Sequence, residues 1–185
     1  MVTLHYSTTK EDYELYYTFM YWDKKDRKRK RLRNLIKQAI FYLLIISFLF
    51  FSKSYSFLGS YSIGIFLFVL VFNLLPFFTG RAQIVKQAES ITNDPENESI
   101  FMEVTVVATD TDLHLKDKFT QTTTLWAAII KKIETPTHYY LFINGMQAYL
   151  IPKRAFKNNE EKSAFDKILS RNLSLDAELN DFNNS

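Results

Sequence analysis

Two long apolar stretches stand out from the mixed pattern of hydrophobic and polar positions along the chain. Residues 35–52 and 61–78 are almost entirely apolar, and a short connection separates them. A membrane-spanning helix needs about 20 consecutive apolar residues, so this pattern favours a transmembrane helical hairpin within 35–79. The alternative is a pair of buried helices in a core, which is disfavoured because so few charges interrupt either stretch. A signal peptide does not fit, since the first apolar stretch begins only at residue 35.

The segment before the hairpin predicts a strand followed by a helix. Residues 2–6 alternate apolar and polar side chains, as a strand does. Thr9 and Asp12 then have the spacing of a capping box, with Asp in place of the usual Glu. An isolated strand cannot satisfy its own backbone amides. We therefore expect the strand to pair with the sheet formed by the chain that follows the hairpin.

The segment after the hairpin predicts a small antiparallel sheet and a final helix. Alternating runs between residues 100 and 152 indicate about six short strands, and Asn144-Gly145 is a strong hairpin signal. Asn158 or Asn159 is expected to cap the last helix, where Glu160 and Glu161 follow in the first turn. The strand phases and the helix stripe predict a shared core of Trp126, Leu141, Ile143, Leu150, Phe156, Phe165 and Ile168.

These elements predict an α+β membrane protein, with a transmembrane helical hairpin and a small antiparallel sheet covered by a C-terminal helix. The expected parts are an N-terminal cytoplasmic segment (1–34), the hairpin (35–79), a cytoplasmic domain (80–172) and a flexible tail (173–185).

A block of basic residues directly precedes the first apolar stretch. It carries a net charge of +7, whereas the whole chain carries only +3. The positive-inside rule then predicts that both termini lie in the cytoplasm and that the short connection lies outside. The same cations are candidates for contact with anionic lipid. Nucleic-acid binding is the disfavoured alternative, because membrane topology already explains the block. The cations are Lys24, Lys25, Arg27, Lys28, Arg29, Lys30, Arg31 and Arg33.

Residues in the C-terminal half resemble a known family. The resemblance is carried by Trp126 with the isoleucines at 129 and 133, by the run YYLFINGMQAYLIPKRAF at 139–156, and by a helix that begins with acidic residues and contains Phe165 and Leu169. This pattern resembles the YcxB-like family, small bacterial membrane proteins with a two-helix hairpin and a C-terminal domain. The IPKRAF ending at 151–156 is similar to that of pleckstrin-homology (PH)-like membrane proteins. The resemblance implies a PH-like sheet and a location in the bacterial cytoplasmic membrane. It says little about mechanism, because fold does not fix function.

The sequence contains no recognisable catalytic motif. A nucleophile elbow, a P-loop, a dinucleotide fingerprint and an HExxH motif are all missing, and the chain has no cysteine. We therefore expect no enzymatic activity, no cofactor and no metal site. Asp110, Asp112 and His114 would share one strand face and could approach a cation, but a solvated strand face is the favoured interpretation.

Two further positions are weak candidates for contacts. Lys153 and Arg154 at the strand–helix junction could bind a phosphate or a partner, although a turn that places Phe156 in the core explains them better. Asn73 in the second apolar stretch is expected to form a hydrogen bond between helices.

The expected function is that of a non-enzymatic membrane protein that presents its cytoplasmic PH-like domain to a protein partner or to anionic lipid. The alternative is an immunity protein that protects its cell against an envelope-targeting toxin or bacteriocin. The chain is also expected to be able to form a homo-oligomer.

Overall fold

The computed structural model describes residues 1–51 and 55–173, and between residues 46 and 69 it describes only some of the side chains. The predicted flexible tail lies outside the described residues, apart from Leu173. The chain forms two compact units. One, which we call the β unit, joins Met1–Tyr16 to Glu89–Ser185, and the other, the helical unit, is Tyr17–Ala88.

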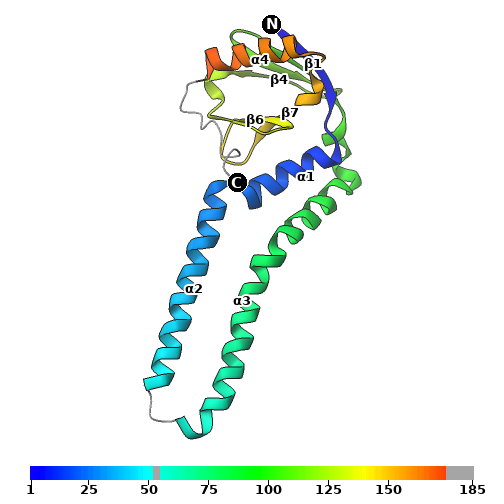
Figure 1. Ribbon diagram of the computed structural model, residues 1–185. Helices are drawn as coiled ribbons and strands as arrows, with labels where there is room; N and C mark the ends of the chain where they lie inside the picture. Colours follow the sequence, from blue (N-terminus) through cyan, green and yellow to red (C-terminus); the bar gives the residue numbers. More distant parts are fainter. Residues whose placement is uncertain (52–54, 174–185) are drawn as a thin grey trace. The chain divides into compact units, whose positions relative to one another are not determined.

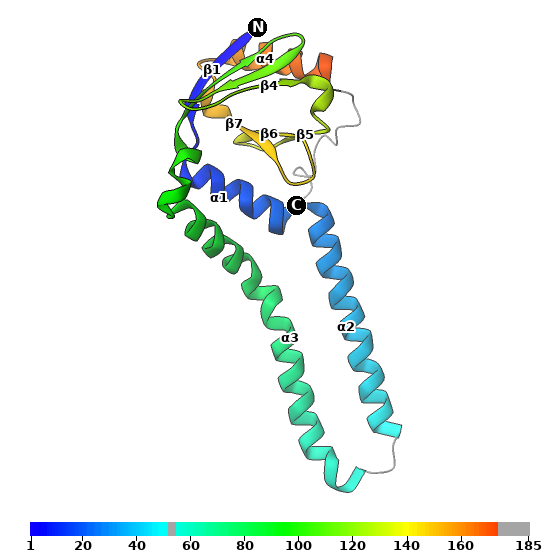
Figure 2. The same ribbon diagram turned by 180° about the vertical axis from the view of Figure 1, so that it is seen from behind.

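In its described residues, the β unit contains seven strands in two antiparallel sheets (Figures 1 and 2). The first sheet has the order β1-β2-β3-β4, formed by Val2–Ser7, Glu103–Ala108, Asp112–Lys116 and Gln121–Leu125. The second has the order β5-β6-β7, formed by Lys131–Glu134, His138–Phe142 and Ala148–Pro152. The prediction of one small sheet is therefore wrong. The reason is a 3₁₀ turn, η3 (Trp126–Ala128), which follows β4 at once and directs the chain into a separate sheet.

The N-terminal strand completes the first sheet. β1 pairs with β2 from Val2 opposite Ala108 to Ser7 opposite Glu103, although about a hundred residues separate the two strands in sequence. The alternating side chains Val2, Leu4 and Tyr6 are buried. The prediction that residues 2–6 join the C-terminal sheet is confirmed.

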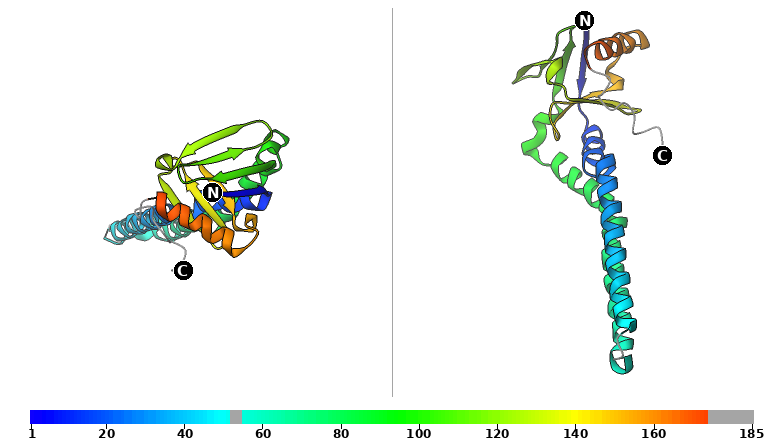
Figure 3. Two further views of the ribbon diagram at one scale, coloured as in Figure 1. Left: turned by 90° about the horizontal axis from the view of Figure 1, so that it is seen from above. Right: turned by 90° about the vertical axis from the view of Figure 1, so that its left-hand side faces the viewer.

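Helix α4 (Asn159–Asn172) covers the core of the β unit and lies beside β1 (Figure 3). The Asn158 side chain caps it by accepting a hydrogen bond from the backbone N–H of Glu161 at 2.8 Å, as predicted. The apolar stripe of α4 buries Phe165, Ile168 and Leu169 in the shared core.

The predicted core is largely confirmed. Trp126, Leu141, Phe165 and Ile168 are buried, while Ile143 and Phe156 are partly buried and pack against the cluster. Leu150 is the exception, because its neighbour Ile151 occupies the core-facing position of β7. Strand side chains alternate with a period of two, so an error of one residue in phase moves a side chain to the other face.

The described part of the helical unit contains a five-residue π-helical turn, η1 (Phe19–Asp23), and two long helices, α2 (Lys25–Phe51) and α3 (Tyr55–Thr92). The last four residues of α3, 89–92, belong to the β unit. Nε2 of Gln38 on α2 donates a hydrogen bond to Oδ1 of Asn73 on α3 at 3.4 Å. The predicted role of Asn73 between helices is confirmed.

The helices of the described part of the chain fall short of what a bilayer crossing demands, either in length or in apolar character. The predicted transmembrane hairpin over 35–52 and 61–78 is therefore wrong, as are the expected class of membrane protein and the location in the bacterial cytoplasmic membrane. The described polar side chains Lys37 and Gln38 in α2 and Asn73 in α3 interrupt the two stretches.

Trp22 is held tightly inside the helical unit. The guanidinium carbon of Arg31 lies 3.7 Å from the centre of its ring, and Nη1 of Arg31 donates to the Trp22 carbonyl at 2.8 Å. On α3, a Cβ added to Gly80 would lie 2.5 Å from Cζ3 of the same ring. Gly80 is therefore required for the close approach of α3 to this indole.

We expect Gly80→Ala to destabilise the helical unit by about 1–3 kcal/mol, because an extra methyl group overpacks the Trp22 contact. Chemical denaturation followed by the fluorescence of Trp22, in a Trp126→Phe background, would measure the change. Gly64→Ala is the matched control, since a Cβ there meets nothing within 4 Å. Equal unfolding midpoints for the two variants would contradict the assigned contact.

Candidate functional site

A capping box fixes the carboxylate of Asp12 at the start of α1 (Lys10–Thr18). The backbone N–H of Thr9 donates to Oδ2 of Asp12 at 2.7 Å, and the N–H of Asp12 donates to the Thr9 hydroxyl oxygen at 3.2 Å. This reciprocal pair is the one predicted from the spacing of the two residues. It places the Asp12 carboxylate between β1 and the second sheet.

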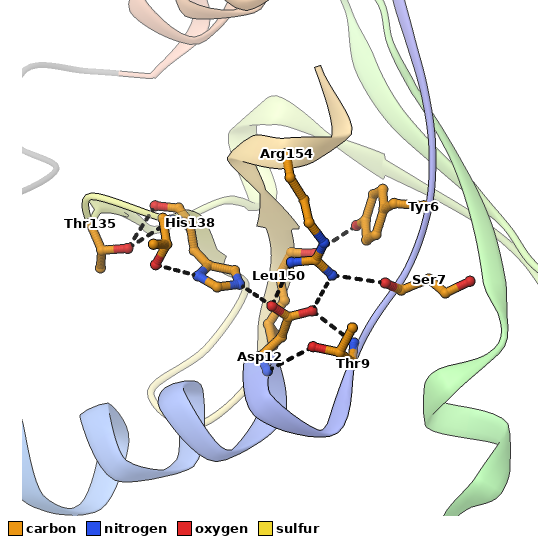
Figure 4. Close-up of polar contacts among 9 residues, drawn as sticks. Tyr6, Ser7, Thr9, Asp12, Thr135, His138, Leu150 and Arg154 are labelled. Atoms are coloured by element: carbon orange, nitrogen blue, oxygen red, sulfur yellow. Dashed lines mark hydrogen bonds and ion pairs between the residues drawn. The ribbon is translucent and has the colours of Figure 1, made fainter. Parts of the chain in front are cut away.

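Asp12 joins a polar network with His138 and Arg154 (Figure 4). Nε2 of His138 on β6 donates to Oδ1 of Asp12 at 2.9 Å. Nη1 of Arg154, in the 3₁₀ turn η4 (Lys153–Ala155), donates to the same oxygen at 2.6 Å, and Nη2 donates to Oδ2. Asp12 and His138 are only 4% and 2% exposed, so the pair is shielded from solvent.

Further hydrogen bonds tie this network to β1 and β7. Nη2 of Arg154 also donates to the Ser7 carbonyl at 3.1 Å. The Tyr6 hydroxyl donates to the Leu150 carbonyl at 2.6 Å. Among the described residues, no buried side-chain nitrogen or oxygen lacks a hydrogen-bond partner. The network therefore holds the N-terminal segment against the sheets.

The partners of His138 define its neutral tautomer. A carboxylate can only accept, so the proton on Nε2 is the one donated to Asp12. Nδ1 lies 2.9 Å from the Thr137 hydroxyl, which donates to it when the ring is neutral. Because both ring nitrogens have partners within the chain, His138 cannot act on a substrate without losing one of these bonds.

The electrostatics of the network favour a charged Asp12–Arg154 pair. Burial alone would raise the pKa of Asp12, but hydrogen bonds from Arg154, Thr9 and His138 outweigh it and hold this pKa well below its usual range. The hydrogen bond to Asp12 raises the pKa of Arg154 against the opposing effect of burial. Burial raises the pKa of Tyr6, and the negative charge of Asp12 raises it further. Asp12 is thus ionised and Tyr6 neutral at ordinary pH.

The two weak phosphate or partner candidates both contact carboxylates of the chain. Arg154 is held by Asp12, and Nζ of Lys153 donates to Oε1 of Glu134 at 2.7 Å. Lys153 also lies 5.1 Å from the ring centre of Tyr139. The η4 turn places Phe156 against the core, which is what the alternative interpretation expected.

The candidate cation ligands lie around the turn between β2 and β3. Oδ1 of Asp112 lies 3.0 Å from Nε2 of His114, and the hydroxyl of Thr109, the largest influence, lowers the pKa of Asp112. Asp110 instead pairs with Arg171 on α4 at 3.0 Å. Within the described ranges, the structure contains no group of three or more His, Cys, Asp or Glu residues that could hold a metal ion.

The basic block begins at Lys24, which follows η1, and continues through the first turns of α2. Lys24 and Arg31 are half-buried and the other six cations are exposed. Five of those six have no carboxylate partner among the residues that the structure describes: Arg27, Lys28, Arg29, Lys30 and Arg33.

The Asp12–His138–Arg154 network could not be predicted from the sequence. The capping box placed Asp12 at a helix start, but 126 and 142 residues separate it from its two partners. Each of the three residues alone is an ordinary surface type, and only the pairing of β1 with the C-terminal sheet brings them together.

Comparison with known proteins supports the resemblance found in the sequence. The family model described as YcxB-like protein matches residues 109–169. This segment runs from the turn before β3 to the last turns of α4, and it includes His138 and Arg154. Neither the curated proteins nor the solved structures gave a match to the chain. The resemblance of this chain to the YcxB-like family is thus confirmed over residues 109–169.

Proposed function

We propose that this chain is a non-enzymatic binding protein that attaches to anionic lipid headgroups through the basic block of residues 24–33. The single observation that carries the proposal is the concentration of exposed, unpaired cations on the first turns of α2. The β unit, held together by its internal polar network, would be the part presented to a partner at that surface.

The position of the charge is unfavourable for the isolated helix. The N-terminus of a helix carries a partial positive charge, so cations in the first turns are repelled by it. Like charges three or four residues apart, such as Arg27 with Arg31 and Lys30, also destabilise a helix. Asp26 is the one acid in the block. An external anionic surface would relieve this repulsion.

The available energy is enough for a peripheral attachment. Each Lys or Arg near an anionic lipid surface contributes about 1 kcal/mol, so five unpaired cations supply roughly 5 kcal/mol. The rest of the chain has a net negative charge, since the whole carries +3 and the block carries +7. This difference favours contact through the block over contact through any other face.

We expect the full-length chain to sediment with vesicles of phosphatidylcholine and phosphatidylglycerol, and much less with phosphatidylcholine alone. Changing Arg27, Lys28, Arg29 and Lys30 together to Gln should weaken binding at least about tenfold, as should high salt. The matched control changes four exposed lysines of the β unit to Gln and removes the same charge: Lys116, Lys118, Lys157 and Lys167.

Equal loss in the two quadruple variants would overturn the proposal, as would equal binding to both kinds of vesicle. Binding of duplex DNA through the same four cations, without binding to the anionic vesicles, would also overturn it and would assign the block to nucleic acid. The immunity role stays a prediction, because no feature of the described residues bears on a toxin.

A further inference from the structure

Strand β4 is an edge strand of the four-stranded sheet. On one side it pairs with β3, from Asp112 opposite Leu125 to Lys116 opposite Gln121. The strand order gives β4 no second neighbour within the described chain (Figure 3). The opposite edge strand, β1, is partly covered, because Arg154 donates to its Ser7 carbonyl and α4 lies beside it.

The hydrogen-bond phase of β4 can be derived from its turn. The N–H of Asp117 donates to the Thr120 carbonyl at 3.0 Å, so these two residues form a hydrogen-bonded pair. Hydrogen-bonded pairs alternate along an antiparallel ladder. The backbone groups of Gln121, Thr123 and Leu125 therefore point away from β3, toward the open side of the sheet.

This edge lacks the sequence features that usually prevent an edge strand from pairing with another chain. Natural edge strands are protected by charged side chains, proline or a bulge. β4 has the sequence QTTTL, with none of these, and all its residues but Thr124 are exposed. Large apolar side chains are exposed at its end and in the turn before it, since Leu125 is 60% and Phe119 is 67% exposed.

We propose that β4 pairs with β4 of a second copy of this chain, in an antiparallel arrangement with its two-fold axis at Thr123. This is the register that uses all five residues, because it sets Gln121 opposite Leu125, Thr122 opposite Thr124, and Thr123 opposite itself. The four-stranded sheets of the two copies would then join into one continuous eight-stranded sheet.

The charges around this edge favour a second copy of the chain as the partner of β4. No charged side chains face each other across the axis, because β4 carries none. In one copy Lys116 is paired with Gln121, and in the other Leu125 is paired with Asp112. Because Gln121 would lie opposite Leu125, these four residues would form one row across the two copies. This row would have a positive charge at one end and a negative charge at the other. Five paired residues are few beside a standard interface of about 1,600 Å², so the dimer is expected to be weak and to need trapping.

The chain has no cysteine, so single cysteines can test the register. Residues opposite each other in a hydrogen-bonded pair have Cα atoms about 5.5 Å apart, which a disulfide can span. In the purified full-length chain, kept in mild detergent to cover its exposed apolar side chains, Thr123→Cys should form disulfide-linked dimers. Gln121→Cys and Leu125→Cys should crosslink poorly alone and well when the two variants are mixed.

Two controls separate this contact from general association. Ser170→Cys places a thiol on the exposed face of α4 and should crosslink slowly. Adding Thr123→Lys to the mixed pair should lower crosslinking roughly fivefold, because like charges directly opposite are destabilising, whereas Thr3→Lys on β1 should not. Equal crosslinking at positions 123 and 170, or no gain on mixing, would overturn the proposal whatever the vesicle experiments show.

Discussion

Replacing Asp12 with Ala is expected to lower the free energy of unfolding of the β unit by about 2–4 kcal/mol. The change leaves the Nε2–H of buried His138 without an acceptor, which costs about 1–3 kcal/mol. It also removes the capping box at the start of α1, which costs about 1 kcal/mol. Arg154 adds less, because its side chain is 48% exposed and can turn to water.

Denaturant unfolding followed by the fluorescence of buried Trp126, in a Trp22→Phe background, would measure this change. Asp117→Ala is the control, since that carboxylate is hydrogen-bonded only within its own exposed turn. A loss of stability no larger for Asp12 than for Asp117 would show that the network does not hold the N-terminal segment in place.

The same network predicts how stability depends on pH. Its donors hold the pKa of Asp12 below the value of about 3.9 expected in an unfolded chain. The unfolded state therefore binds the proton more readily, and the stabilisation from Asp12 is complete above about pH 4 and declines as the pH falls further. Unfolding measured down to acidic pH should show a steeper decline for the wild type than for Asp12→Asn. Parallel curves would contradict the assigned role.

Local features of the fold could be predicted from the sequence. The capping box at Thr9 and Asp12, the Asn158 cap and the hairpin at Asn144-Gly145 each depend on residues a few positions apart. The pairing of β1 was predictable for another reason, since an isolated strand must find a partner for its amides. The division into two sheets was not predictable, because it depends on how the chain turns at Trp126.

The candidate site was largely hidden from sequence reasoning. The sequence makes Arg154 a weak candidate for a phosphate or partner contact, and it favours a turn that places Phe156 in the core. The structure shows that the partner of Arg154 is Asp12, at the other end of the sequence. Nothing near His138 in sequence indicates that its partner is a buried carboxylate. Contacts of this kind depend on the tertiary fold and have no local pattern.

Truncating Phe165 to Ala is expected to have the largest effect on the β unit, a loss of about 3–5 kcal/mol in the free energy of unfolding. Phe165 is fully buried, and its ring lies 5.6 Å from that of Tyr139 and 5.4 Å from that of Phe156. Because these neighbours belong to β6 and to the segment after η4, the cavity would be lined by elements that are fixed elsewhere. They cannot all move in to fill it, so most of the lost contact is not recovered. Phe119→Ala, which truncates an exposed ring, is the matched control and should change stability by less than about 0.5 kcal/mol. If denaturant unfolding gave similar losses for both variants, α4 would not be the element that covers the core.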